Sequence, residues 1–225
     1  MDRPGKRYRV RGVAGGAAAL LLLAGCGGGD GGGDSPARAL AKAEVASVLP
    51  DAKAVPGWQN QTKPQAQERN PQFPPPVCLT AAKDKHGTAC DRITFWGVSA
   101  FTRKSDRTAL NFWTLAYKDE KSADAAYDAL AGYYGGDRVG IDAVPVKIGD
   151  PGDEHLANRA RTGTMGGPAT LTQIRSGTTV LGVSTGTEGT SALSDQQVKD
   201  IAAMFTERAE QAQNGEKPTS ALPGR

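Results

Sequence analysis

The chain has 225 residues, of which 38% are hydrophobic and 23% charged, so it is long enough to bury a hydrophobic core. Its formal charge of +3 does not indicate a nucleic-acid partner, because five basic residues and one acid lie within residues 1–25. Residues 26–225 carry 22 basic and 23 acidic side chains, and no basic stripe interleaved with aromatic residues appears among them.

The N-terminus has the parts of a secretory signal peptide. Basic residues up to Arg11 precede a short apolar run, Val13–Ala24, which ends in small residues. A run of this length is too short to cross a bilayer as a helix, which takes about 20 residues, and no later run is long enough either. The sequence therefore predicts an exported protein without a transmembrane helix.

The end of this run, Leu23-Ala24-Gly25-Cys26, resembles the lipobox of bacterial lipoproteins at all four positions. The resemblance implies that residues 1–25 are removed and that Cys26 carries diacylglyceryl and palmitate chains. These chains would hold the protein at the outer face of the cytoplasmic membrane, so the membrane is its expected partner. The alternative is an ordinary secreted protein in which Cys26 occurs by chance.

The first segments after the signal are expected to be a tether and a helix. Residues 26–34 are rich in Gly and predict a flexible tether. Ser35 and Pro36 are typical of a helix N-cap and first turn, and Pro50 is expected to end that helix. Residues 51–76 are rich in Pro and Gln and are expected to be an irregular lead into the cysteine loop.

Two cysteines remain after Cys26. Cys78 and Cys90 have only one possible pairing, and an exported protein retains disulfides, so we expect a bond between them. A metal site is the alternative, but it would need more histidine or cysteine ligands, and the loop contains only His86.

The rest of the chain predicts an α+β fold. The aromatic and β-branched runs 93–103 and 109–118 indicate an antiparallel hairpin, and apolar residues at helical spacing follow over 123–134. Further strands are expected over 139–148 (weak), 155–161, 169–175 and 178–185. We thus expect a twisted antiparallel sheet of five or six strands with helices packed on one face.

A capping box, Ser194 to Gln197, begins the closing helix. Its apolar stripe is expected to face the sheet, whereas polar residues such as Arg208 fall mostly elsewhere. Residues 35–213 are expected to form one extracytoplasmic domain, and residues 214–225 a flexible tail.

Possible catalytic motifs do not have the context that catalysis requires. Residues 182–186 match the G-x-S-x-G pattern around Ser184, but no histidine follows and the pattern lies in a predicted strand. Asp150, Asp153 and Glu154 surround a turn without calcium-loop spacing, and no histidines cluster as zinc ligands would. The sequence predicts no enzyme activity, no metal and no cofactor.

Aromatic residues concentrate on the predicted hairpin, where Trp96 and Trp113 lie on adjacent strands. One interpretation is a groove for an apolar or glycan ligand, with Arg103 and Arg159 supplying polar groups. The alternative is that these aromatic residues form the core beneath the helices.

The order of elements resembles a known family. The elements are, in chain order, two nearby cysteines, a strand pair, a helix, a Gly-Asp turn at 149–154 and the hairpin 170–180. In this order they resemble the extracellular sensor domain of PknH-type bacterial Ser/Thr kinases and related lipoproteins. That domain has two disulfides and this chain can form only one. The resemblance implies binding or sensing without catalysis, and it transfers no active-site residues. Two other functions stay open, a small cell-envelope hydrolase and a purely structural lipoprotein.

Overall fold

The structure is a computed structural model that describes residues 37–81, 88–134, 139 and 142–224. All of them belong to one compact unit, Ser35–Arg225. The predicted signal peptide, Cys26 and the Gly-rich tether lie outside the described residues. No helix in the described part of the chain is long and apolar enough to cross a membrane.

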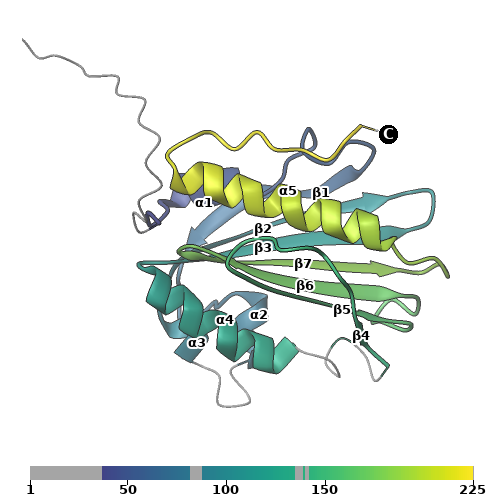
Figure 1. Cartoon of the computed structure of the whole chain (residues 1–225), viewed down its shortest axis with the longest axis horizontal. Coiled ribbons are helices and arrows are strands. Elements are labelled where there is room, and N and C mark those ends of the chain that lie inside the picture. The colour runs from purple at the N-terminus through teal and green to yellow at the C-terminus, as the bar shows by residue number, and fades with distance from the viewer. Residues whose placement is uncertain (1–36, 82–87, 135–138, 140–141, 225) are drawn as a thin grey trace, which may run out of the picture. The chain divides into compact units, whose positions relative to one another are not determined.

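In the described part of the chain, seven strands form one antiparallel sheet in the order β1-β2-β3-β7-β6-β5-β4 (Figure 1). This confirms the predicted α+β class, with more strands than the expected five or six. The strands are β1 (Gln59–Glu68), β2 (Ile93–Arg103), β3 (Thr108–Tyr117), β4 (Val144–Pro145), β5 (Glu154–Ala160), β6 (Ala169–Ser176) and β7 (Thr179–Thr187).

Helices cover both faces of the sheet, whereas we expected them on one face. One face packs against α1 (Lys42–Val48) and α5 (Asp195–Gln213), and the other against α2 (Pro76–Ala81), α3 (Thr88–Asp91) and α4 (Glu120–Tyr134) (Figure 1). The reason is that the central strands carry large apolar residues on alternate positions of both faces. On β3, for example, Phe112 belongs to the α1–α5 core and Leu115 to the α2–α4 core.

Two N-terminal elements differ from expectation. The helix α1 begins at Lys42, where the Glu44 carboxylate accepts a bond from the Ala41 backbone N–H at 2.7 Å and caps the helix. The cap expected at Ser35 and Pro36 lies outside the described residues. The polar segment 59–68 is a strand and not an irregular lead. It pairs with β2 and lies at the sheet edge, the position where a proline such as Pro64 is tolerated.

The helix α5 begins as predicted. The Ser194 hydroxyl accepts from the Gln197 backbone N–H at 3.2 Å, and the Gln197 side chain accepts from the Ser194 N–H at 2.9 Å. The stripe of apolar residues on α5 is buried, and Phe205 lies edge-on to Phe112 with ring centroids 5.1 Å apart. This helix is therefore a principal element of the α1–α5 core.

Residues after α5 fold back onto the domain, which corrects the expectation of a flexible tail. The chain turns at Gly215 in the left-handed region (φ +80°) and returns along α5. The Leu222 N–H donates to the Ala54 carbonyl at 2.8 Å, and the Leu222 side chain packs against the core. The tail looks unstructured in sequence because it has little apolar pattern, and its backbone is instead bonded by side chains of α5, including Gln211.

The predicted disulfide between Cys78 and Cys90 is confirmed, with the two Cα atoms 5.9 Å apart. It links α2 to α3, and Cys78 is buried in the α2–α4 core. Both helices are short, at 6 and 4 residues, so they depend on this bond and on core contacts more than on their own hydrogen bonds.

We expect that reducing this disulfide lowers the free energy of unfolding by about 2–5 kcal/mol, because reduction removes the constraint on the unfolded chain. Denaturant unfolding with and without reductant measures the difference. Thiol titration of the denatured protein serves as the control and should find free Cys78 and Cys90 thiols only after reduction. Two free thiols before reduction would contradict the bond.

Candidate ligand groove

A groove of ≈ 330 Å³ lies on the α2–α4 face of the sheet, at the β2–β3 hairpin. Its floor holds both tryptophans of the hairpin, and the start of α2 forms one side. We call it the tryptophan groove; the side chains that define it are those of Thr62, Pro75, Pro76, Val77, Trp96, Val98, Ala100, Asn111, Trp113, Leu115 and Ser184.

Strand register brings the two tryptophans together. Val98 pairs with Trp113 and Trp96 pairs with Leu115, so all four side chains point to the same face. The sequence interpretation offered either a groove or a core for Trp96 and Trp113, and the structure places them at the boundary between the two. Trp96 is 8% exposed and belongs to the α2–α4 core, whereas Trp113 is half-buried beside it.

Gly182 leaves the space that the Trp113 indole occupies. It is the partner of Trp113 across β3 and β7, and a Cβ atom at this position would overlap the indole ring. The absence of a side chain therefore lets the indole lie against the backbone of β7. This is the structural role of the first glycine in the G-x-S-x-G pattern, and sequence reasoning did not find it.

Neutral polar groups border the apolar floor. The Asn111 amide donates to the Ser184 hydroxyl at 3.5 Å, at the solvent-facing side of the groove. The indole N–H of Trp96 is buried and has no hydrogen-bond partner in the described part of the chain. No side chain that lines the groove titrates near neutral pH. The groove can thus hold an uncharged molecule, and it offers no acid, base or nucleophile pair.

The two arginines expected in the groove lie elsewhere. Arg103 pairs with Thr108 and Arg159 with Thr170, which puts both side chains on the α1–α5 face. Arg159 donates to the Asp195 carboxylate at 2.6 Å, at the N-terminus of α5. Arg103 and Arg159 are therefore not part of the tryptophan groove, because strand register sends them to the opposite face.

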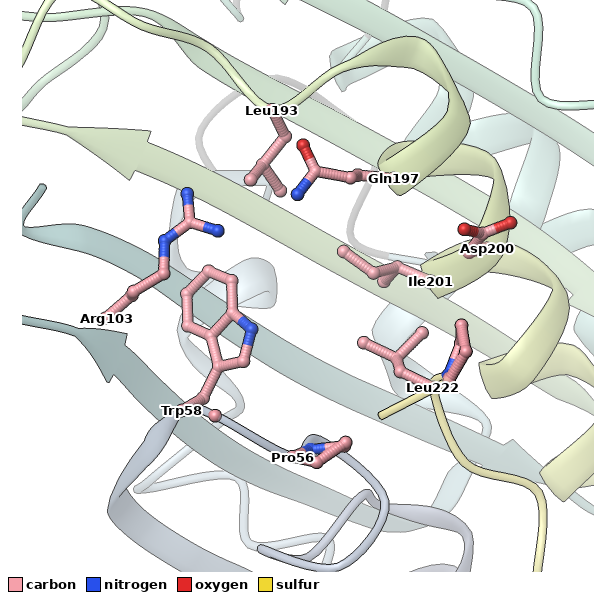
Figure 2. Close-up of a pocket in the computed structure, with 10 residues that line it drawn as sticks. Pro56, Trp58, Arg103, Leu193, Gln197, Asp200, Ile201 and Leu222 are labelled. Carbon is pink, nitrogen blue, oxygen red and sulfur yellow. The ribbon is translucent and has the colours of Figure 1, made fainter. Parts of the chain in front are cut away.

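Arg103 contributes to a smaller pocket of ≈ 150 Å³ on the α1–α5 face (Figure 2). Its guanidinium lies 4.9 Å from the ring centroid of Trp58 and bonds the Asp106 carboxylate at 2.5 Å. The hydrogen bond from Arg103 is the main cause that lowers the pKa of Asp106 to about 2. The apolar sides of this pocket come from Leu193, Ile201 and the returning tail at Leu222.

The structure does not bring a histidine to Ser184. Ser184 lies within β7 beside Asn111, and His155 lies on the opposite face of the sheet, in register with Ile174. His86 lies outside the described residues. Across the ranges that the structure describes, no base accompanies Ser184 and no triad is formed.

Two of the three carboxylates around the 150–154 turn, those of Asp153 and Glu154, are engaged in hydrogen bonds. Asp153 accepts from the Arg175 guanidinium at 2.9 Å and from the Gly177 N–H at 2.8 Å, and Glu154 accepts from Arg175 at 2.5 Å. Within the described residues, no cluster of three His, Cys, Asp or Glu side chains could hold a metal ion. These acids therefore anchor the β6–β7 hairpin to β5.

The fold of this chain is similar to that of a solved extracellular domain. The crystal structure of the extracellular domain of PknH from Mycobacterium tuberculosis covers 82% of this chain and 100% of that chain, with 15% sequence identity and a TM-score of 0.50. At this identity the similarity concerns the fold. No family model and no curated protein matches the sequence.

Proposed function

We propose that this chain is a lipid-anchored extracytoplasmic protein that binds a ligand in the tryptophan groove without transforming it. The observation that carries the proposal is the groove itself, an open cavity with two tryptophans and uncharged polar side chains at its edge. Pockets of this kind, mostly apolar with a few polar groups, are typical ligand sites. The fold shared with the extracellular domain of PknH supports a sensor-like role.

The two alternative functions have less support. A hydrolase needs a nucleophile beside a base, and the described partner of Ser184 is the Asn111 amide, which is not a base. A purely structural lipoprotein needs no groove, and the open cavity at Trp96 and Trp113 has no role in it.

Native mass spectrometry of the protein released from the cell envelope tests the binding function. We expect a bound mass on the wild-type protein that is lost in Trp113→Ala, because this substitution removes the more exposed of the two indoles on the groove floor. Trp58→Ala, on the opposite face of the sheet, is the matched control and should retain the bound mass. The proposal is wrong if no adduct is present, or if both variants keep it.

Cell fractionation tests the anchor. Cys26→Ser should leave the precursor uncleaved or release the protein from the membrane, since the serine hydroxyl cannot take the thioether-linked lipid. The double variant Cys78→Ser/Cys90→Ser removes the other two cysteines and should still fractionate with membranes. A Cys26→Ser protein that matures and fractionates like the wild type would overturn the anchor.

A further inference from the structure

The tryptophan groove continues into an uncovered part of the sheet. Opposite residues of antiparallel strands share a face, so the register defines a row of side chains across six strands beside Trp113. This row, which we call the polar row, consists of Thr62, Ala100, Asn111, Ser184, Leu171 and Asn158. Asn111 is exposed and the other five are half-buried, so the helices do not cover the row.

The polar row carries no charge. None of its six residues is Asp, Glu, Lys or Arg, although such residues make up 23% of the chain. The two neighbouring rows also contain no Asp, Glu, Lys or Arg. One of them runs through Trp113 and the other through Ala109. Among the described residues, these three rows therefore offer no partner to an ionic ligand, since carboxylates and phosphates are bound by Arg or Lys.

The polar groups of the row can each donate and accept hydrogen bonds. The Asn111 and Asn158 amides and the Ser184 and Thr62 hydroxyls all combine a donor with an acceptor. A sugar hydroxyl does the same, so it can pair with any of them. An acyl chain would instead cover these groups without pairing them, which costs free energy.

We propose that the polar row and Trp113 bind a neutral oligosaccharide, a class of ligand narrower than the proposed binding function on which this inference rests. A pyranose ring with equatorial hydroxyls has an apolar C–H face, which packs against the indole of Trp113. Its hydroxyls then reach Asn111 and Ser184, which lie in the adjacent row. Strands are spaced by about 4.8 Å, so the row extends over about 24 Å and accommodates several rings.

Isothermal titration of the purified mature protein tests this inference with four named probes. Cellohexaose and chitohexaose are the neutral saccharides, hexagalacturonate is the acidic saccharide, and palmitate is the acyl chain. We expect at least one neutral hexaose to bind and the acidic hexamer not to bind, because none of the described residues in the polar row or in its two neighbouring rows is a cation. Tryptophan fluorescence should change with the same saturation curve, since Trp113 lies at the contact.

Two variants locate the site. Asn111→Leu should weaken hexaose binding about tenfold, the factor that one hydrogen bond of ordinary strength supplies. Trp58→Ala, on the opposite face, should bind the hexaose like the wild type. Thermal unfolding of both variants verifies that they are folded.

Each contrary result has a distinct meaning. Binding of neither hexaose, or equal hexaose binding by Asn111→Leu and the wild type, overturns the saccharide inference. Binding of palmitate alone also overturns it but leaves the proposed binding function intact. The envelope-purified adduct tests that wider function separately, because it presumes no ligand class.

Discussion

Phe205→Ala is expected to lower the free energy of unfolding by about 3–5 kcal/mol, the usual cost of truncating a fully buried phenylalanine. Phe205 is 0% exposed at the centre of the α1–α5 core. Its ring packs edge-on against Phe112, which packs edge-on against Phe101 at 6.0 Å between centroids. The substitution leaves a cavity at the point where α5 meets the middle of the sheet.

Denaturant unfolding measures this change, and Lys199→Ala on the exposed side of α5 is the control. We expect the control to change stability by less than about 0.5 kcal/mol. Because the free energy of unfolding of a native domain is only about 5–15 kcal/mol, Phe205→Ala should also reduce the yield of folded protein. An unchanged unfolding midpoint would mean that α5 is not docked on the sheet.

Arg208→Met is expected to lower the free energy of unfolding by about 2–4 kcal/mol, because it leaves buried carbonyl groups without a donor. The guanidinium donates to the Ser47 carbonyl at 2.7 Å and to the Val48 carbonyl at 2.8 Å, at the C-terminal end of α1. It also donates to the Ser220 carbonyl of the returning tail at 2.9 Å. Burial lowers the pKa of Arg208, but an arginine remains a cation at neutral pH and complements the end of a helix.

The matched control for Arg208→Met is Arg161→Met. The Arg161 side chain is 88% exposed and, among the described residues, pairs with Asp142 at the surface, so its loss should cost less than about 1 kcal/mol. Unfolding curves of the two variants, recorded beside the parent, make the comparison. Equal stability of both variants would show that the bonds from Arg208 do not hold α1 and the tail.

Elements with a strong local pattern could be predicted from sequence. The hairpin of β2 and β3, the helix α4 and the capped helix α5 all carry apolar residues at the spacing of their own secondary structure. The strand β1 could not be predicted in this way, because a polar segment such as 59–68 becomes a strand only through pairing with β2. The position of the tail could not be predicted either, because its backbone is bonded by side chains of α5 and carries no pattern of its own.

The candidate site was predictable only where it depends on one hairpin. Trp96 and Trp113 were expected side by side because β2 and β3 are adjacent in sequence. Arg103 follows Trp96 by seven positions in β2 without an irregularity between them, so the alternation of side chains along the strand already predicts that Arg103 lies on the opposite face. The role of Gly182 could not be predicted, because it depends on β7 lying beside β3. Arg208 was expected at the surface, because the carbonyl groups that allow its burial come from distant segments of the chain.

The bonds of Arg208 have a consequence for the order in which the domain is completed. They join residues 160 positions apart, so residues 42–48 have left the ribosome long before their capping partner is synthesised. Until α5 arrives, the last carbonyls of α1 lack this donor and the apolar side of α1 lacks one of its packing partners. The protein therefore cannot close its α1–α5 core during synthesis and completes it in a late step, as expected for a topology that joins distant segments.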